Sequence, residues 1–73
     1  MQKFYEGLAE VLEIDTAEAG PALVLADHSW DSLAVVSTIA LIDECFDLML
    51  PSQALLACKT AGDIEALIRA KQG

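Results

Sequence analysis

The sequence predicts an all-α protein: a four-helix bundle of three main helices and one short helix, with a long loop between the first and second helices. Apolar residues recur at the 3.6-residue spacing of amphipathic helices in three separate segments. Residues that favour the starts and stops of helices stand at the ends of those segments. The length of 73 residues and the 55% hydrophobic content fit a single domain, residues 1–73, with a packed core.

The first helix is predicted over residues 2–14. Its apolar stripe comprises Tyr5, Leu8, Val11 and Leu12, extended by Phe4 and Ile14. Residues 15–30 then lack a clear period, and Gly20-Pro21 interrupts them. A loop this long in a small domain is usually functional or packed down by its own side chains. We expect the second case, with two or more of the apolar residues 22–25 inserted into the core.

The second helix is predicted over residues 32–47. One face of it would collect the apolar and small side chains of Val35, Thr38, Ile39, Ile42, Cys45 and Phe46. The β-branched residues in this segment leave a strand as the alternative, but the period and the length favour a helix. Asp31 fits the N-cap position, where its carboxylate accepts hydrogen bonds from free backbone N–H groups.

The last third of the chain is predicted to form two further helices. Pro51 ends the second helical unit, and Ser52 is expected to cap a short helix over residues 53–57. Thr60 and Asp63 resemble a capping box, with Asp in place of Glu. The final helix then has an apolar stripe and a cationic last turn, formed respectively by Ile64, Leu67 and Ile68 and by Arg69 and Lys71.

The charge balance limits the possible partners. Twelve acidic residues against four basic ones give a net charge of -8, which repels nucleic acid and anionic membrane surfaces and favours partners with basic patches. The longest uncharged run, residues 33–42, is too short to span a bilayer, so no membrane insertion is expected. The start "MQKFYEG" has no apolar signal region. We therefore expect a cytoplasmic monomer with reduced thiols.

The residue types that carry catalysis or bind metals do not form a recognisable site. Cys45, Cys58 and the single His28 lack the spacing of a metal site, and both cysteines are expected to be small buried hydrophobes. Ser, His and Asp are all present, but no Gly-x-Ser-x-Gly motif occurs and the chain is too small for an oxyanion pocket. The sequence therefore predicts no catalytic and no metal-binding residues.

The second helix has an unusual outer face. Half of the six residues predicted there are apolar: Leu33, Val36, Ser37, Ala40, Glu44 and Asp47. A solvated face normally carries more charge, so we interpret this one as a docking surface for partner proteins. Ser32 lies at the edge of this face in the first turn, where a phosphate on its hydroxyl would be tolerated next to the positive end of the helix dipole.

These residues resemble a known family. "DSL" at 31–33 opens a helix, "FD" follows at 46–47, Pro51 closes the unit, and "KTAGDIEALI" occupies 59–68. In this register they are similar to the acyl carrier proteins over nearly the whole chain. The resemblance implies an acyl-carrier-like bundle, with 4′-phosphopantetheine transferred from coenzyme A to Ser32 between Asp31 and Leu33. It also implies a phosphopantetheinyl transferase and acyl-transferring and condensing enzymes as partners, with basic or apolar docking patches, and no catalysis by the chain itself.

The sequence also departs from that family's commonest members. Acidic residues are frequent early in the second helix of fatty-acid carriers, whereas residues 33–42 here hold no charge. Ala34 and Ser37 occupy such positions, and both are expected to lie off the core stripe. This favours a dedicated fatty-acid-like, polyketide or specialised lipid pathway. A peptidyl or aminoacyl carrier, or a small acidic interaction module without a prosthetic group, are the alternatives.

Three residues before the second helix have simpler interpretations. "HS" at 28–29 is similar to the histidine-serine of peptidyl carrier domains, but Ser29 precedes the predicted cap, so Ser32 is the expected attachment site. His28 is expected to be a surface or capping residue. Trp30 is expected to cover the loop side of the core.

Overall fold

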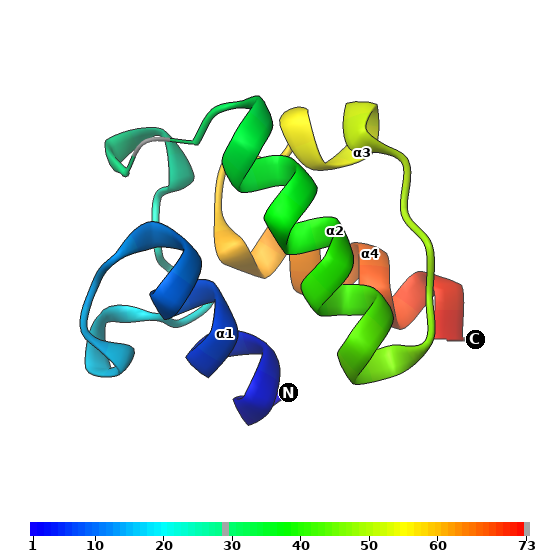
Figure 1. Cartoon of the computed structure of the whole chain (residues 1–73), viewed down its shortest axis with the longest axis horizontal. Coiled ribbons are helices and arrows are strands. Elements are labelled where there is room, and N and C mark those ends of the chain that lie inside the picture. Colours follow the sequence, from blue (N-terminus) through cyan, green and yellow to red (C-terminus); the bar gives the residue numbers. More distant parts are fainter. Residues whose placement is uncertain (29, 73) are drawn as a thin grey trace.

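Four α-helices and two 3₁₀ turns make up the computed structural model, which describes residues 1–28 and 30–72. The elements, in chain order, are α1 Gln2–Leu12, η1 Thr16–Glu18, η2 Leu25–Asp27, α2 Ser32–Phe46, α3 Ser52–Leu56 and α4 Ala61–Gln72. Helix α2 crosses the front of the bundle in Figure 1, with α1 on one side, α3 on the other and α4 behind it. The predicted all-α bundle with one short helix and one long loop is confirmed.

Helix α1 ends two residues earlier than predicted. Glu13 adopts the left-handed conformation with φ 57° and ψ 44°, and the N–H of Ile14 donates to the carbonyl oxygen of Ala9 at 2.9 Å. A left-handed residue with such a hydrogen bond commonly ends a helix, and that residue is usually glycine. Because Glu13 stands there instead, the sequence carried no signal for the end of the helix. The buried stripe of α1 also differs from the prediction, because Tyr5 and Val11 are only half-buried; it comprises Phe4, Leu8, Ala9 and Leu12.

The long loop is packed down, as expected. Leu23 and Leu25 are buried, while Val24 between them points outward. Val24 forms an antiparallel bridge with Thr60, in which the N–H of Leu25 donates to the Lys59 carbonyl at 3.0 Å. The loop therefore contributes side chains to the core and binds the start of α4 through its backbone.

Helix α2 begins as its cap residue predicts. Oδ1 of Asp31 accepts a hydrogen bond from the N–H of Ala34 at 2.9 Å. The strand alternative is wrong, because residues 32–46 are helical throughout. Thr38 is fully buried, and its hydroxyl donates to the Ala34 carbonyl at 2.8 Å, which satisfies the one polar side chain in this part of the core. The buried residues of α2 are Ala34, Val35, Thr38 and Ile42, with Ile39, Cys45 and Phe46 half-buried.

The starts of α3 and α4 differ in how they are capped. Ser52 is the first residue of α3, not its cap; Pro51 holds the N-cap position and no side chain caps the helix. The capping box before α4 is confirmed, because Asp63 N–H donates to Thr60 Oγ1 at 3.3 Å and Asp63 Oδ2 accepts from Thr60 N–H at 3.2 Å. Hydrogen bonds from the backbone N–H groups of Lys59 and then Thr60 hold the pKa of Asp63 below its usual value.

A polar contact joins the two ends of the chain. The Tyr5 hydroxyl of α1 donates to Oε1 of Glu65 on α4 at 2.6 Å, and Nε of Arg69 donates to Oε2 of Glu65 at 2.9 Å. Burial, followed by the bond to Glu65, raises the pKa of Tyr5. The hydrogen bonds from Tyr5 and Arg69 lower the pKa of Glu65.

The two cysteines are less buried than expected. Cys45 lies in the last turn of α2 and Cys58 just beyond α3, and both are free thiols of intermediate exposure. The prediction that both are small buried hydrophobes therefore holds only in part: both are half-buried, and Cys58 packs against the core. The expectation for Trp30 is confirmed: the ring packs against the core and its Nε1 donates to the Leu55 carbonyl at 3.3 Å.

Candidate functional site

Ser32 is the first residue of α2 and is exposed to solvent. The first N–H groups of a helix lack partners within the helix, so this end attracts negative charge. The Asp31 carboxylate accepts a hydrogen bond from one of these groups, the N–H of Ala34. The Ser32 hydroxyl lies at the same positive end of the helix. A phosphate ester on that hydroxyl would sit where the helix dipole favours it. Ser29, the other serine of the motif, lies outside the described residues.

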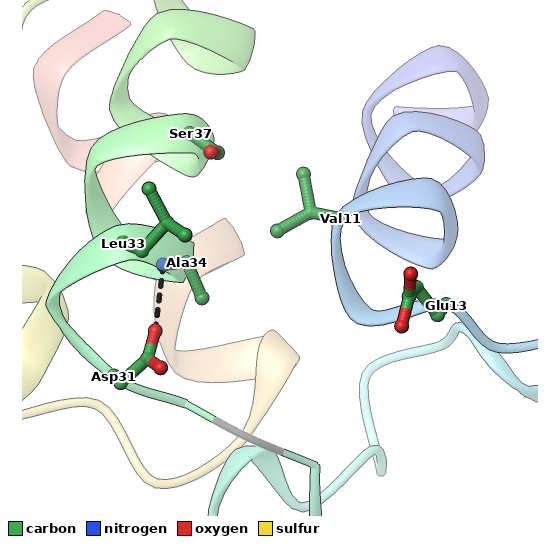
Figure 2. Close-up of a pocket in the computed structure, with 6 residues that line it drawn as sticks. All are labelled: Val11, Glu13, Asp31, Leu33, Ala34 and Ser37. Atoms are coloured by element: carbon green, nitrogen blue, oxygen red, sulfur yellow. Dashed lines mark hydrogen bonds between the residues drawn. The ribbon is translucent and has the colours of Figure 1, made fainter.

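A groove of about 250 Å³ opens between the end of α1 and the start of α2, and the two chain neighbours of Ser32 are among the residues that line it. In Figure 2 Val11 and Glu13 stand on the α1 side and face the residues of the α2 side across the gap. The α2 side contributes Asp31, Leu33, Ala34 and Ser37. Two carboxylates and a hydroxyl thus border three apolar side chains, and no lysine or arginine lines the groove.

The predicted docking surface is exposed over most of its length. Leu33 is 75% exposed and Val36 59%, and because they stand three residues apart on one helix they form an apolar patch open to solvent. Ala40 and Glu44 are exposed on the same helix, and Asp47 is exposed at its C-cap. Ser37 differs, because it is half-buried and lines the groove.

Ala34 is buried at 7% exposure, and the expectation that it lies off the core stripe is wrong. It precedes Thr38 by one helical turn and joins the buried row of α2. A charged side chain at position 34 would therefore face the α1–α2 contact rather than solvent. Any test that adds acids to the docking surface needs other positions.

Sequence reasoning missed part of this site. Val11 was assigned to the core and Glu13 to the first helix, whereas both line the groove. Their approach to α2 depends on how two helices pack, which no local pattern reports. Met49 and Leu56, 73% and 50% exposed, are further exposed apolar side chains that the sequence analysis did not single out.

Two other kinds of site are absent from the part of the chain that the structure describes. Among residues 1–28 and 30–72, no three side chains of His, Cys, Asp or Glu come together as metal ligands. No helix within those ranges has the length and apolar character needed to cross a membrane.

Comparison with known proteins agrees with this geometry. Residues 2–68 match the family model described as phosphopantetheine attachment site. No solved structure matches the chain at a significant level. The match extends from α1 into the second half of α4, so it covers all four helices and the groove as well as the serine.

Proposed function

The chain belongs to the phosphopantetheine attachment family, whose members carry covalently bound 4′-phosphopantetheine, and from that premise we propose that it is an acyl carrier protein modified at Ser32. The observation that carries the assignment is the position of Ser32: an exposed hydroxyl on the first residue of α2, directly after the capping Asp31. The residues present fit the group, because the hydroxyl is accessible and the helix end favours its phosphate.

The attachment step needs a partner enzyme. The Ser32 oxygen bonds to the phosphorus of the pantetheine half of coenzyme A. The phosphoanhydride bond breaks, and the nucleotide half leaves with the other phosphate. The hydroxyl proton passes to a base of the phosphopantetheinyl transferase, and the helix end stabilises the new phosphodiester. Bound there, the group supplies a thiol that holds acyl chains as thioesters, while catalysis is left to the partner enzymes.

Mass spectrometry tests the attachment site directly. The apo-protein is incubated with coenzyme A and a broad-specificity transferase, and Ser32→Ala is compared with Ser29→Ala. We expect the wild type and Ser29→Ala to gain the mass of one phosphopantetheine. Ser32→Ala should gain no mass. Modification that persists in Ser32→Ala would overturn the assignment.

The charge pattern of α2 supports a dedicated pathway. Residues 33–42 carry no charge, and the exposed side chains of Leu33 and Val36 form the apolar centre of the docking surface. Apolar contacts at such a centre supply affinity, whereas charges at the rim mainly steer approach and exclude wrong partners. We propose that the carrier serves its own acyl-transferring and condensing enzymes, of a fatty-acid-like, polyketide or specialised lipid route, and serves general fatty-acid enzymes poorly. Ser37, Ala40, Glu44 and Asp47 complete this surface.

Adding charge to the exposed residues of α2 tests this specificity. Val36→Glu and Ala40→Glu place acids at exposed positions, and Met49→Glu adds the same charge outside α2. We expect the α2 variants, once loaded, to raise kcat/KM several-fold with a general fatty-acid enzyme that has a basic docking patch, with the gain falling as salt increases. Met49→Glu should give little gain. A wild type that already serves this enzyme well, with no change in the α2 variants, would contradict the proposal.

A further inference from the structure

We propose that the groove between the end of α1 and the start of α2 is a resting site for the pantetheine arm. The inference rests on the attachment at Ser32 proposed above. Ser32 stands between Asp31 and Leu33, and both of these neighbours line the groove. Ser32 itself does not line the groove, so the point of attachment lies within one residue of the lining, and the flexible arm folds back across the start of α2 to enter it.

Attachment close to the groove makes even weak affinity sufficient. A group on a short flexible tether has an effective concentration of about 1 mM at nearby sites. A groove with an intrinsic dissociation constant of about 1 mM, or roughly −4 kcal/mol, would then be occupied about half of the time. Such a site would hold the arm between encounters and still release it to partner enzymes.

The chemistry of the lining fits that of the arm. The arm carries two amide N–H donors, a hydroxyl and a geminal dimethyl group, and beyond its phosphate it is neutral. Glu13 offers a carboxylate, and Asp31 keeps lone pairs beyond the one that the Ala34 N–H uses. The Ser37 hydroxyl can donate to an amide carbonyl of the arm. Val11, Leu33 and Ala34 supply an apolar wall for the dimethyl group.

The size of the groove limits what it accepts. Its volume of about 250 Å³ lies below the roughly 300–1,000 Å³ of pockets for drug-sized ligands. It therefore suits a segment of the arm and not a long acyl chain. The lining has carboxylates but no cation, so it would repel an anionic cargo and the phosphate, which stays at the helix end.

Glu13 provides a variant that leaves the fold intact. Its left-handed conformation, φ 57°, disfavours side chains other than glycine or asparagine by about 1 kcal/mol. Glu13→Gly removes the carboxylate and relieves that strain, so the helix end should be at least as stable as in the wild type. Glu10→Gln, at an exposed position of α1, is the matched control that removes one charge outside the groove.

The experiment compares apo- and holo-protein by NMR. Loading is first confirmed by mass, so a failure of the proposed function is seen before the groove is tested. In the holo-protein we expect nuclear Overhauser contacts between the arm's dimethyl protons and the Val11 methyls, and amide shift changes at Val11 and Glu13. Both signals should weaken at least twofold in Glu13→Gly and persist in Glu10→Gln. A fully loaded wild type with no contact or shift at the end of α1 would overturn the inference and leave the attachment at Ser32 standing.

Discussion

Two sides of this small bundle are built differently. We call the contact between the long loop and the start of α4, together with the Tyr5–Glu65–Arg69 contact, the pinned side. Backbone hydrogen bonds of 3.0 Å join residues 21, 23 and 25 of the loop to residues 62, 61 and 59, and Leu25 is fully buried. We call the start of α2, with Ser32, the docking surface and the groove, the open side. Leu33 there is 75% exposed, next to a groove of about 250 Å³.

The difference shows how a chain of 73 residues keeps a stable fold and still leaves large apolar side chains exposed. Cores of this size supply only about 3–5 kcal/mol, so every fully buried side chain matters. The pinned side places loop leucines in the core and satisfies their backbone with hydrogen bonds, which stabilises the bundle without another helix. The open side can then leave large apolar side chains exposed, because the fold does not depend on burying them.

The largest expected effect comes from making the same Leu→Ala substitution on each side and comparing the free energies of unfolding. Leu25→Ala removes a fully buried side chain of the pinned side and should cost about 2–5 kcal/mol of unfolding free energy, most of what the bundle has. Leu33→Ala makes the same truncation on the open side and should change stability by less than about 0.5 kcal/mol. Urea unfolding followed by helical circular dichroism measures both.

The same pair also separates function from stability. Leu33→Ala should fold normally and still lower kcat/KM for loading by the transferase, because Leu33 follows Ser32, the proposed attachment site. Equal loss of stability in the two variants would show that the bundle does not depend on its pinned side more than on its open side.

The sequence predicted the pinned side only in outline. Gly20-Pro21 and the apolar residues 22–25 indicated a packed loop, and the structure confirms this through Leu23 and Leu25. Their hydrogen-bond partners at residues 59–62 could not be predicted, because the pairing joins segments far apart in the chain. The capping box of Thr60 and Asp63 was predictable, since both of its residues are local.

On the open side, the spacing of apolar residues predicted the helix but not all of its buried residues or the groove. Asp31 and the start of α2 could be predicted from local cap chemistry, and the role proposed for Ser32 came from the family resemblance. Ala34 was misassigned, because the buried face of α2 is wider than the predicted stripe. The groove was not predicted, because it depends on Glu13 ending α1 in the left-handed conformation without the glycine that usually marks such an end.

A second, smaller effect is expected where the loop meets α4. A Cβ at Gly62 would lie 2.9 Å from the Pro21 carbonyl oxygen, the acceptor of the Gly62 N–H, so Gly62→Ala should force the two backbones apart. We expect a loss of about 1–3 kcal/mol, reduced by the better helix propensity of alanine. Gly20→Ala is the matched control, because a Cβ there meets nothing within 4 Å. Thermal unfolding should give a lower Tm for Gly62→Ala and an unchanged or higher one for Gly20→Ala; the reverse order would contradict the pinned contact.

The smallest expected effect concerns pH and the Tyr5–Glu65–Arg69 contact. Because hydrogen bonds lower the pKa of Glu65 in the folded chain, the unfolded chain binds its proton first, at a pH near the ordinary glutamate value of about 4.3. The contribution of Glu65 to stability is therefore present above that pH and is lost as pH falls through the lower pKa of the folded state. Glu65→Gln keeps an acceptor for the Tyr5 hydroxyl but loses the charge, so at pH 7 it should cost less than about 1 kcal/mol, since Arg69 is largely exposed.

The difference in unfolding free energy between wild type and Glu65→Gln should shrink between pH 5 and pH 3. Glu10→Gln serves as the control for general charge, because protonating any carboxylate relieves the self-repulsion of a chain with net charge -8. If this contact contributes as the geometry indicates, Glu65→Gln loses stability relative to Glu10→Gln at pH 7, and this difference between the two variants shrinks as the pH falls. The difference in unfolding free energy between wild type and Glu65→Gln could instead stay constant with pH, or Glu10→Gln could reproduce it. Either result would show that the pinned side is stabilised by the loop leucines and their backbone hydrogen bonds, and not by the polar contact between α1 and α4.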